Sequence, residues 1–157
     1  MWRGVVSSLH TAPAAGARME THARIAAIAG RGISGDRYFL GLGTYSDKPG
    51  PGVDRQMTLI ESETLAALAR DQNIAVAPDQ VRRNIVTTGV PLNHLVGREF
   101  LIGAVRVRGF RLCQPCAYLG ELLDSPKIFN ALLHRGGLNC EILEGGDIRT
   151  GDPVRPA

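Results

Sequence analysis

Apolar and polar residues alternate over short segments along this chain, and glycine interrupts most of these segments. Alternation with a period of two is the pattern of a half-buried β-strand. The predicted strands lie at residues 2–9, 22–28, 56–60, 81–87, 99–110 and 138–143. Residues 61–70 have helical spacing instead, with acidic residues early and an arginine late, as the helix dipole favours. The pattern therefore predicts many short strands and few helices.

The connections refine this prediction. Residues 30–38 form a glycine-rich loop, and residues 38–53 form a long irregular excursion rich in glycine and proline. In a compact domain, such a long loop is usually functional or disordered. The ending, residues 145–154, predicts a hairpin turn and a last short strand. Because no alternation of strand, helix and strand is apparent, we predict a mainly β fold with a few helices, a closed or half-closed β-barrel.

Length and composition favour one domain spanning residues 1–157. A chain of 157 residues with 44% apolar content buries a core without disulfides or metals. The first ten residues lack an uninterrupted apolar run, and no segment approaches membrane-spanning length. Three cysteines, an odd number, are more naturally reduced than paired. These features predict a cytoplasmic protein that does not associate with membranes.

The basic residues are almost all arginine. Eighteen are present, and only Lys48 and Lys127 are lysines, which leaves sixteen arginines. The planar guanidinium suits phosphate, sulfate and carboxylate groups. A GC-rich coding sequence explains the same excess without any ligand. The net charge of +3 is small and the arginines are dispersed, so we expect no nucleic-acid partner.

The chemistry of the chain centres on Cys113 and Cys116, which flank Gln114 and Pro115. A predicted strand precedes this pair, and an apolar segment with helical spacing follows it. Cys116 is therefore expected at or next to a helix N-terminus, where unpaired N–H groups and the helix dipole stabilise a thiolate. The nearby Arg111 is expected to add to this effect.

Other interpretations of the cysteines remain open. A Cys-x-x-Cys pair can be half of a zinc site, but a second pair is missing and the four histidines, His10, His22, His94 and His134, are scattered. A thioredoxin-like dithiol requires a βαβ context. Both cysteines could also be buried packing residues, an interpretation that fits Cys113 better than Cys116. Cys140 lies in an apolar run and is expected in the core.

Six segments, taken in order, resemble a known family. They are Gly35-Asp36-Arg37-Tyr38, Arg55-Gln56-Met57-Thr58-Leu59-Ile60-Glu61, Arg82-Arg83-Asn84-Ile85, Leu92-Asn93-His94-Leu95-Val96-Gly97, Cys113-Gln114-Pro115-Cys116 and Gly145-Gly146-Asp147-Ile148-Arg149-Thr150-Gly151-Asp152. Together they resemble a stand-alone MOSC domain, the module named for the C-terminal part of molybdenum cofactor sulfurases. The resemblance implies a closed, pyruvate-kinase-like β-barrel, a reactive cysteine that carries sulfur or meets molybdenum, and a basic pocket for the pterin phosphate of the molybdenum cofactor (molybdopterin).

The resemblance assigns roles to particular positions. Cys116 matches the cysteine of the family and is the expected sulfur carrier or molybdenum ligand. Cys113 either resolves a persulfide on Cys116 or simply packs. Arg82, Arg83 and Asn84 match a region suited to an anionic ligand, although either arginine could face solvent instead.

Two further pairs are candidates for cofactor binding. Asp36 and Arg37 are one of them, and a structural ion pair that fixes the glycine-rich loop is the competing interpretation. Arg55 is a candidate for cofactor binding as well, and a structural contact is again the competing interpretation. His134 and Arg135 could offer cationic and backbone donors to a phosphate, whereas a turn with two following glycines needs no ligand to explain it.

The resemblance also implies partners. The sequence shows no pyridoxal-phosphate desulfurase domain, so a sulfur carrier of this kind depends on a cysteine desulfurase or another donor, with pyridoxal phosphate only in that partner. A molybdenum-dependent enzyme would depend on an electron-transfer partner. The leading hypothesis is a molybdenum-cofactor-binding or sulfur-carrier protein that uses Cys116 in an arginine-lined cleft. The alternatives are a small molybdenum-dependent reductase of N-hydroxylated compounds and a non-catalytic thiol or zinc binding module.

Overall fold

A computed structural model describes all residues of the chain except 51, 115 and 116. Cys116, on which the sulfur-carrier hypothesis depends, therefore lies outside the described residues. In chain order the elements are β1 (Gly4–Thr11), β2 (Glu20–His22), β3 (Arg24–Ile28), β4 (Gly32–Ile33), η1 (Val53–Arg55), β5 (Met57–Glu61), α1 (Ser62–Gln72), β6 (Ile85–Thr88), η2 (Leu92–Leu95), β7 (Glu99–Ile102), β8 (Val105–Leu112), α2 (Ala117–Leu122), α3 (Ile128–Ala131), β9 (Leu138–Glu144), β10 (Gly146–Arg149) and β11 (Pro153–Pro156).

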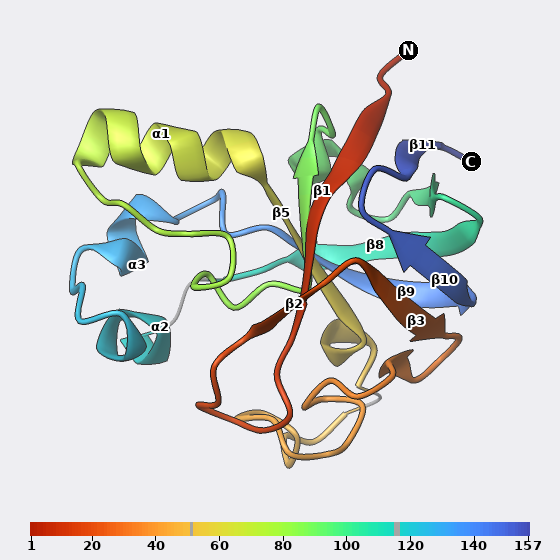
Figure 1. Ribbon diagram of the computed structural model, residues 1–157, viewed down its shortest axis with the longest axis horizontal. Coiled ribbons are helices and arrows are strands. Elements are labelled where there is room, and N and C mark those ends of the chain that lie inside the picture. The colour runs from red at the N-terminus through yellow and green to blue at the C-terminus, as the bar shows by residue number, and fades with distance from the viewer. Residues whose placement is uncertain (51, 115–116) are drawn as a thin grey trace.

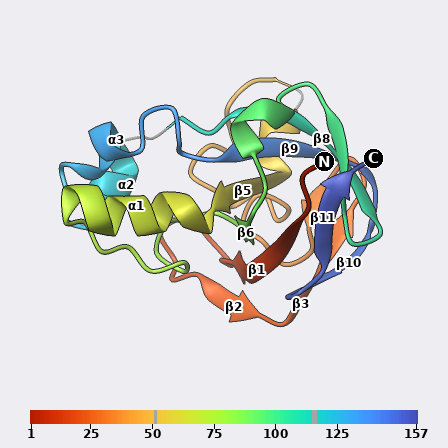
Figure 2. The same cartoon turned by 90° about the horizontal axis from the view of Figure 1, so that it is seen from above.

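The strands form a closed barrel. Within the described part of the chain, seven strands pair in the order β11-β7-β8-β9-β5-β6-β1, and β11 also pairs with β1, which closes the ring. Strand β2 extends the sheet beyond β1, and a separate small sheet has the order β10-β3-β4. Figures 1 and 2 show this small sheet beside the barrel, away from the helices. The predicted mainly β, closed-barrel fold is confirmed.

Alternation along the strands fills the barrel interior. In β8, Val105 and Val107 are buried, whereas Arg106 and Arg108 point outward and pair with Glu99 of β7. Residues from all seven strands of the ring join one apolar cluster, which includes Leu9, Leu59, Ile85, Phe100, Val107, Cys140 and Val154. Burial of these side chains is the main force that closes the ring.

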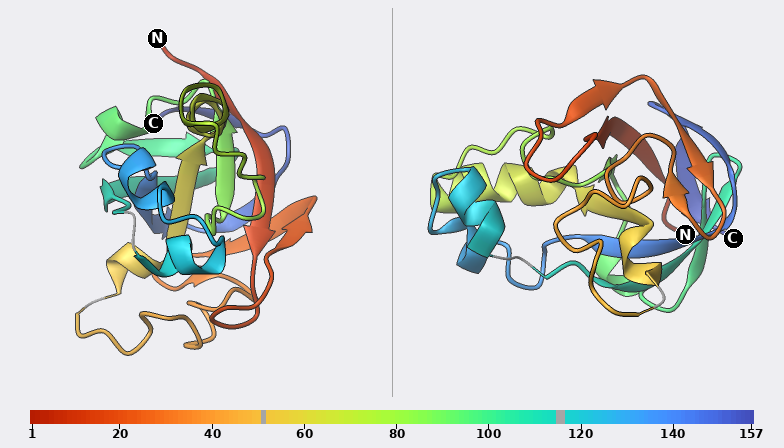
Figure 3. Two further views of the ribbon diagram at one scale, coloured as in Figure 1. Left: turned by 90° about the vertical axis from the view of Figure 1, so that its left-hand side faces the viewer. Right: turned by 90° about the horizontal axis from the view of Figure 1, so that it is seen from below.

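The three helices lie together at one end of the molecule, as Figures 1 and 3 show. A second apolar cluster holds them there, since Leu68 of α1, Leu119 of α2 and Ile128 of α3 pack with Ile60 of β5 and Val86 of β6. Helix α1 is capped by Asn73, which has a left-handed backbone and whose N–H donates to the Leu68 carbonyl oxygen. Among the described residues, no helix is both long and apolar enough to cross a membrane.

Two expected strands are each divided in the structure. Residues 99–110 were predicted as one strand, but β7 and β8 form a hairpin there, because Gly103 adopts φ 57° and turns the chain back. Residues 22–28 were also predicted as one strand. They contribute instead to β2 and β3, which belong to different sheets.

Three further predictions need correction. Strand β6 begins at Ile85 rather than at residue 81, because Arg82 has φ 66° and interrupts the extended backbone. The turn after β10 does not close a hairpin, since β10 pairs with β3 whereas β11 pairs with β1 and β7. Finally, the fold does contain a strand–helix–strand unit, because β5 and β6 pair in parallel and α1 lies in the connection between them.

Candidate functional site

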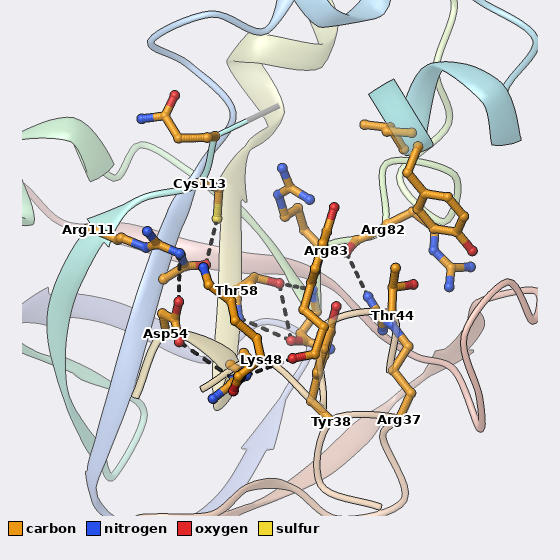
Figure 4. Close-up of a pocket in the computed structure, with 17 residues that line it drawn as sticks. Arg37, Tyr38, Thr44, Lys48, Asp54, Thr58, Arg82, Arg83, Arg111 and Cys113 are labelled. Carbon is orange, nitrogen blue, oxygen red and sulfur yellow. Dashed lines mark hydrogen bonds and ion pairs between the residues drawn. The ribbon is translucent and has the colours of Figure 1, made fainter. Parts of the chain in front are cut away.

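A cavity of about 320 Å³ lies between the long loop after residue 37, the segment 82–84 and the stretch that follows β8 (Figure 4). This volume is within the range of small-molecule sites. The residues that line it are Arg37, Tyr38, Thr44, Tyr45, Lys48, Asp54, Arg55, Thr58, Arg82, Arg83, Asn84, Arg111, Cys113, Gln114, Tyr118, Leu119 and Asn139. We call it the arginine cavity.

Arg55 holds the long loop in place. Its Nη1 donates to the carbonyl oxygens of Tyr45 at 2.7 Å and Lys48 at 2.8 Å. The neighbouring Asp54 binds Arg111 of β8, with Oδ2 2.6 Å from Nη2. These contacts join the loop to the barrel wall, and they commit part of the donor capacity of both arginines to structure.

Asp36 and Arg37 form a buried ion pair behind the cavity, with Oδ1 and Nη1 3.1 Å apart. Only 1% of Asp36 and 6% of Arg37 is exposed. The Asp36 carboxylate also accepts the N–H of Ala12 at 3.1 Å, and Arg37 donates to the carbonyl oxygen of Arg82 at 3.3 Å. Because its partners are fixed groups of the protein, Arg37 positions the segment that carries Arg82.

The segment 82–84 presents two arginines to the cavity. The positive φ of Arg82 directs this side chain towards Ala17, whose carbonyl oxygen it binds. Burial lowers the pKa of Arg82, and Arg37 lowers it further. Asn84 is buried and fixes the segment, since its Oδ1 accepts the Thr58 N–H at 3.1 Å and its Nδ2 donates to the His10 carbonyl oxygen at 3.2 Å.

Arg83 lies beside Cys113. Its Nε donates to the Gly136 carbonyl oxygen at 2.8 Å, which orients the guanidinium. Cys113 is buried, and its thiol donates to Oδ1 of Asn139 at 3.0 Å. Burial raises the pKa of the Cys113 thiol, and Arg83 and Arg111 offset only part of that increase. Cys113 is therefore held as a neutral thiol.

The charge of the arginine cavity is strongly unbalanced. Six cationic side chains line it, those of Arg37, Lys48, Arg55, Arg82, Arg83 and Arg111, and among the described lining residues Asp54 is the single carboxylate. Asp36 pairs with Arg37, and Asp54 pairs with both Arg55 and Arg111, so the described residues provide fewer carboxylates than cations around this cavity. Such an arrangement favours an anionic ligand.

The structure gathers most of the residues that the sequence singled out. Arg37, Arg55, Arg82, Arg83, Asn84 and Cys113 line the arginine cavity, and Asp36 supports Arg37 from behind. His134 and Arg135 do not line it. The two glycines after Arg135 serve close packing, because a Cβ at Gly136 or Gly137 would overlap the carbonyl oxygen of Cys113 or Leu59. Cys140 is buried in the barrel core, as expected.

Sequence reasoning missed the aromatic part of the site. All three tyrosines of the chain, Tyr38, Tyr45 and Tyr118, line the cavity. Lys48 and Asp54 were missed as well. The signal for Tyr38, Tyr45 and Lys48 was the long loop itself, whose irregular composition indicated a functional segment. Among the described residues, no group of three or more His, Cys, Asp or Glu is placed to hold a metal ion.

The fold and the cavity together define a small β-barrel protein with a polycationic ligand site. Comparison with known families makes this specific: the model of the MOSC domain matches residues 42–155, and the chain belongs to this family. The Gly35–Tyr38 segment lies just ahead of the matched residues. MOSC domains are associated with the molybdenum cofactor. No curated protein matches the sequence.

Solved structures show the same fold. The YUAD protein from Bacillus subtilis aligns with a TM-score of 0.79 and 21% identity, over 98% of this chain and 97% of that chain. YiiM from Geobacillus stearothermophilus aligns with a TM-score of 0.72 and 16% identity, over 98% of this chain and 75% of that chain. YiiM from Escherichia coli aligns with a TM-score of 0.66 and 18% identity, over 100% of this chain and 70% of that chain. At these identities the likeness shows the fold alone.

Proposed function

We propose that this chain binds the molybdenum cofactor through its phosphate-bearing pterin in the arginine cavity. The observation that carries the proposal is the imbalance of six cations against one lining carboxylate in a cavity of about 320 Å³. Partial burial strengthens each interaction between these cations and an anion. Membership of a family associated with this cofactor supports the same ligand class.

The residues present fit such a ligand. Arg83 is the best candidate for the phosphate, because it lines the cavity beside Cys113 and the Gly136 carbonyl oxygen fixes its Nε, which orients the guanidinium. Arg82 and Lys48 add positive charge nearby. Tyr118 offers an aromatic ring and a hydroxyl suited to a planar, polar ring system, and Tyr38 adds a ring that is already stacked against Arg37. When bound, the cofactor supplies a redox-active metal with sulfur ligands.

We also propose that Cys116 is the sulfur carrier of this site. Gln114 and Tyr118, each two residues from Cys116, both line the cavity. The covalent chain keeps the Cα atom of Cys116 within about 7 Å of the Cα atom of either residue. A cysteine near these cations is expected to be more acidic than the buried Cys113. The reduced thiols that this role requires fit a cytoplasmic location.

The proposed transfer begins on a partner, a cysteine desulfurase or another persulfide donor. The Cys116 thiolate attacks the outer sulfur of the persulfide of the donor. The bond between that sulfur and the cysteine of the donor breaks, a persulfide forms on Cys116, and the donor leaves as a thiolate. Pyridoxal phosphate stays in the partner.

Cofactor binding is tested with Arg82→Lys and Arg83→Lys. Each change keeps the charge but loses the bidentate fork, so the productive one should weaken cofactor binding by about 1–3 kcal/mol, roughly 5- to 150-fold. The measurement is molybdenum content and pterin fluorescence of protein from a cofactor-competent host. Arg98→Lys, at an exposed position outside the cavity, is the matched control. Unchanged cofactor binding in both variants would exclude Arg82 and Arg83 as the residues that hold the phosphate.

The carrier role is tested with Cys116→Ser and Cys113→Ser, each incubated with a desulfurase, cysteine and pyridoxal phosphate before intact mass measurement. Cys116→Ser should abolish persulfide loading, and Cys113→Ser should leave the first loading intact. Loading of Cys116→Ser at the parental level would exclude the carrier role. If the parent protein binds molybdenum, accepts no persulfide sulfur and reduces N-hydroxylated compounds with an electron donor, the reductase alternative replaces the sulfur-carrier role.

A further inference from the structure

A second cavity, also about 320 Å³, is lined by polar and charged side chains that the proposed function does not use. Glu61, Thr64, Asn93, His94 and Arg135 contribute to it, and Gly137 forms part of its wall. Among the residues that the structure describes, none lines both this cavity and the arginine cavity. We call it the Glu61–Arg135 cavity. Arg135, which the sequence analysis named as a candidate for cofactor binding and which does not line the arginine cavity, lines this second cavity.

Rigid elements place these side chains. Glu61 ends β5, and Thr64 lies in the first turn of α1, which follows β5 directly (Figure 2). Asn93 and His94 lie on η2, and Asn93 donates from Nδ2 to the carbonyl oxygen of His134 at 2.6 Å. The cavity wall is therefore built from the barrel, a helix start and two segments tied to each other.

The cavity holds opposite charges that do not pair with each other. Oε1 of Glu61 accepts the Leu92 N–H at 2.9 Å, and Nε of Arg135 donates to the Ala131 carbonyl oxygen at 2.7 Å. Across the part of the chain that the structure describes, no ion pair within 4.0 Å joins Glu61 to Arg135 or His94. Each charged group is anchored through one atom, and both residues line the same cavity.

The environment of Glu61 agrees with an incomplete set of partners. Burial raises the pKa of its carboxyl group, the Leu92 N–H lowers it, the neighbouring Glu63 raises it and His94 lowers it. A half-buried carboxylate in this state gains from a cationic partner. On the other side, Arg135 also lies near Asp71, but that exposed carboxylate is already bound to Arg70 at 2.6 Å.

We infer that the Glu61–Arg135 cavity binds a small zwitterion of the free α-amino acid class, with the ligand's ammonium at Glu61 and its carboxylate at Arg135. A simple anion would leave Glu61 repelling it, and a simple cation would be repelled by Arg135. A zwitterion satisfies both groups at once, and Thr64 and His94 add polar contacts. The volume is at the lower end of small-ligand sites, which suits a compact molecule. This inference does not depend on the function proposed for the arginine cavity.

The test is calorimetric titration of the full chain with L-alanine, propionate and ethylammonium, three probes of similar size that differ in charge. L-Alanine should bind saturably, and each singly charged probe should bind at least about tenfold more weakly, because it loses one charge-assisted contact. The inference would be overturned if propionate binds as tightly as L-alanine. It would also be overturned if L-alanine shows no saturable binding at concentrations of about 1 mM and above.

Paired variants separate recognition from folding. Glu61→Gln keeps an acceptor for the Leu92 N–H but removes the charge, so alanine should bind about tenfold more weakly while propionate binds no more weakly than to the parent. Arg135→Gln should show the mirror result with ethylammonium. A variant that merely unfolds would lose binding of both probes together, and a thermal melt identifies such a variant. If one of the charge variants unfolds, Thr64→Val tests the cavity wall with an uncharged change instead.

Two controls fix the location. Arg98→Gln, at an exposed position that lines neither cavity, should bind alanine as the parent does. Arg82→Lys should also leave alanine binding unchanged, because Arg82 lines only the arginine cavity and its side chain binds Ala17 rather than residues 135–137. Loss of alanine binding in Arg82→Lys would place the amino acid in the arginine cavity and overturn the inference. The failure of either proposal is thus visible separately.

Discussion

Removal of the Asp36 carboxylate should be among the most destabilising single changes in this chain. Asp36 and Arg37 are almost completely buried, and the Asp36→Ala variant would leave the Arg37 guanidinium and the Ala12 N–H without their acceptor. Removing one member of a buried ion pair costs about 3–5 kcal/mol. In a domain of this size, 1 kcal/mol shifts Tm by about 2–4 °C, so Tm should fall by about 6–20 °C.

The double variant Asp36→Ala/Arg37→Met decides whether this cost comes from the stranded charge. With the guanidinium gone, the remaining losses are neutral hydrogen-bonding groups, chiefly the acceptor for the Ala12 N–H at about 1–3 kcal/mol and the donor to the Arg82 carbonyl oxygen, and no buried charge is stranded, so the double variant should melt above the single one. Asp47→Ala, an exposed loop position, is the matched control and should stay within about 0.5 kcal/mol of the parent. Calorimetric melts of all four proteins provide the measurement. A double variant no more stable than Asp36→Ala would refute the reasoning.

Two further predictions concern the thiols and a buried histidine. Cys113 and Cys140 should alkylate slowly in the folded protein at neutral pH, because burial raises the pKa of both thiols, and Cys116 should react first; site-resolved mass spectrometry with iodoacetamide measures this, and faster labelling of Cys113 would contradict it. Burial lowers the pKa of His10, with Asp79 opposing and His22 reinforcing that shift, so the neutral ring stabilises the fold above pH 6.5 and that stability falls as the pH drops below 6.5. Urea unfolding at pH 7.5 and 5.0 should show a steeper loss for the parent than for His10→Gln, and equal losses would exclude His10 as the titrating group.

Periodicity predicted the elements of this fold better than their pairing. The alternation of Val105, Arg106, Val107 and Arg108 identifies a strand from sequence alone. It does not reveal that the chain reverses at Gly103, because the alternation continues on both sides of the turn. The parallel pairing of β5 and β6 is equally hidden, since strand direction depends on which segments meet in three dimensions and not on the local pattern.

The site was predictable where the residues lie in one short motif. Arg82, Arg83 and Asn84 were named together and do line one cavity. Tyr45 and Lys48 could not be placed from sequence, because the Arg55 contacts that bring their loop against the barrel join residues separated by an irregular segment. Arg135 was predicted beside the same ligand, but it lines the Glu61–Arg135 cavity instead, next to two glycines that pack closely against the backbone of Cys113 and Leu59.

One short stretch of backbone, residues 135–137, contacts two residues that line the arginine cavity and also forms part of the wall of the Glu61–Arg135 cavity. The carbonyl oxygens of Gly136 and Gly137 hold Arg83 and the Cys113 N–H, while Arg135 and Gly137 line the other cavity. Thermodynamic reciprocity then applies: if an amino acid changes the affinity for the cofactor by some factor, the cofactor changes the affinity for that amino acid by the same factor. Under the two proposals, any coupling between the sites would pass through three residues of backbone and would need no domain movement.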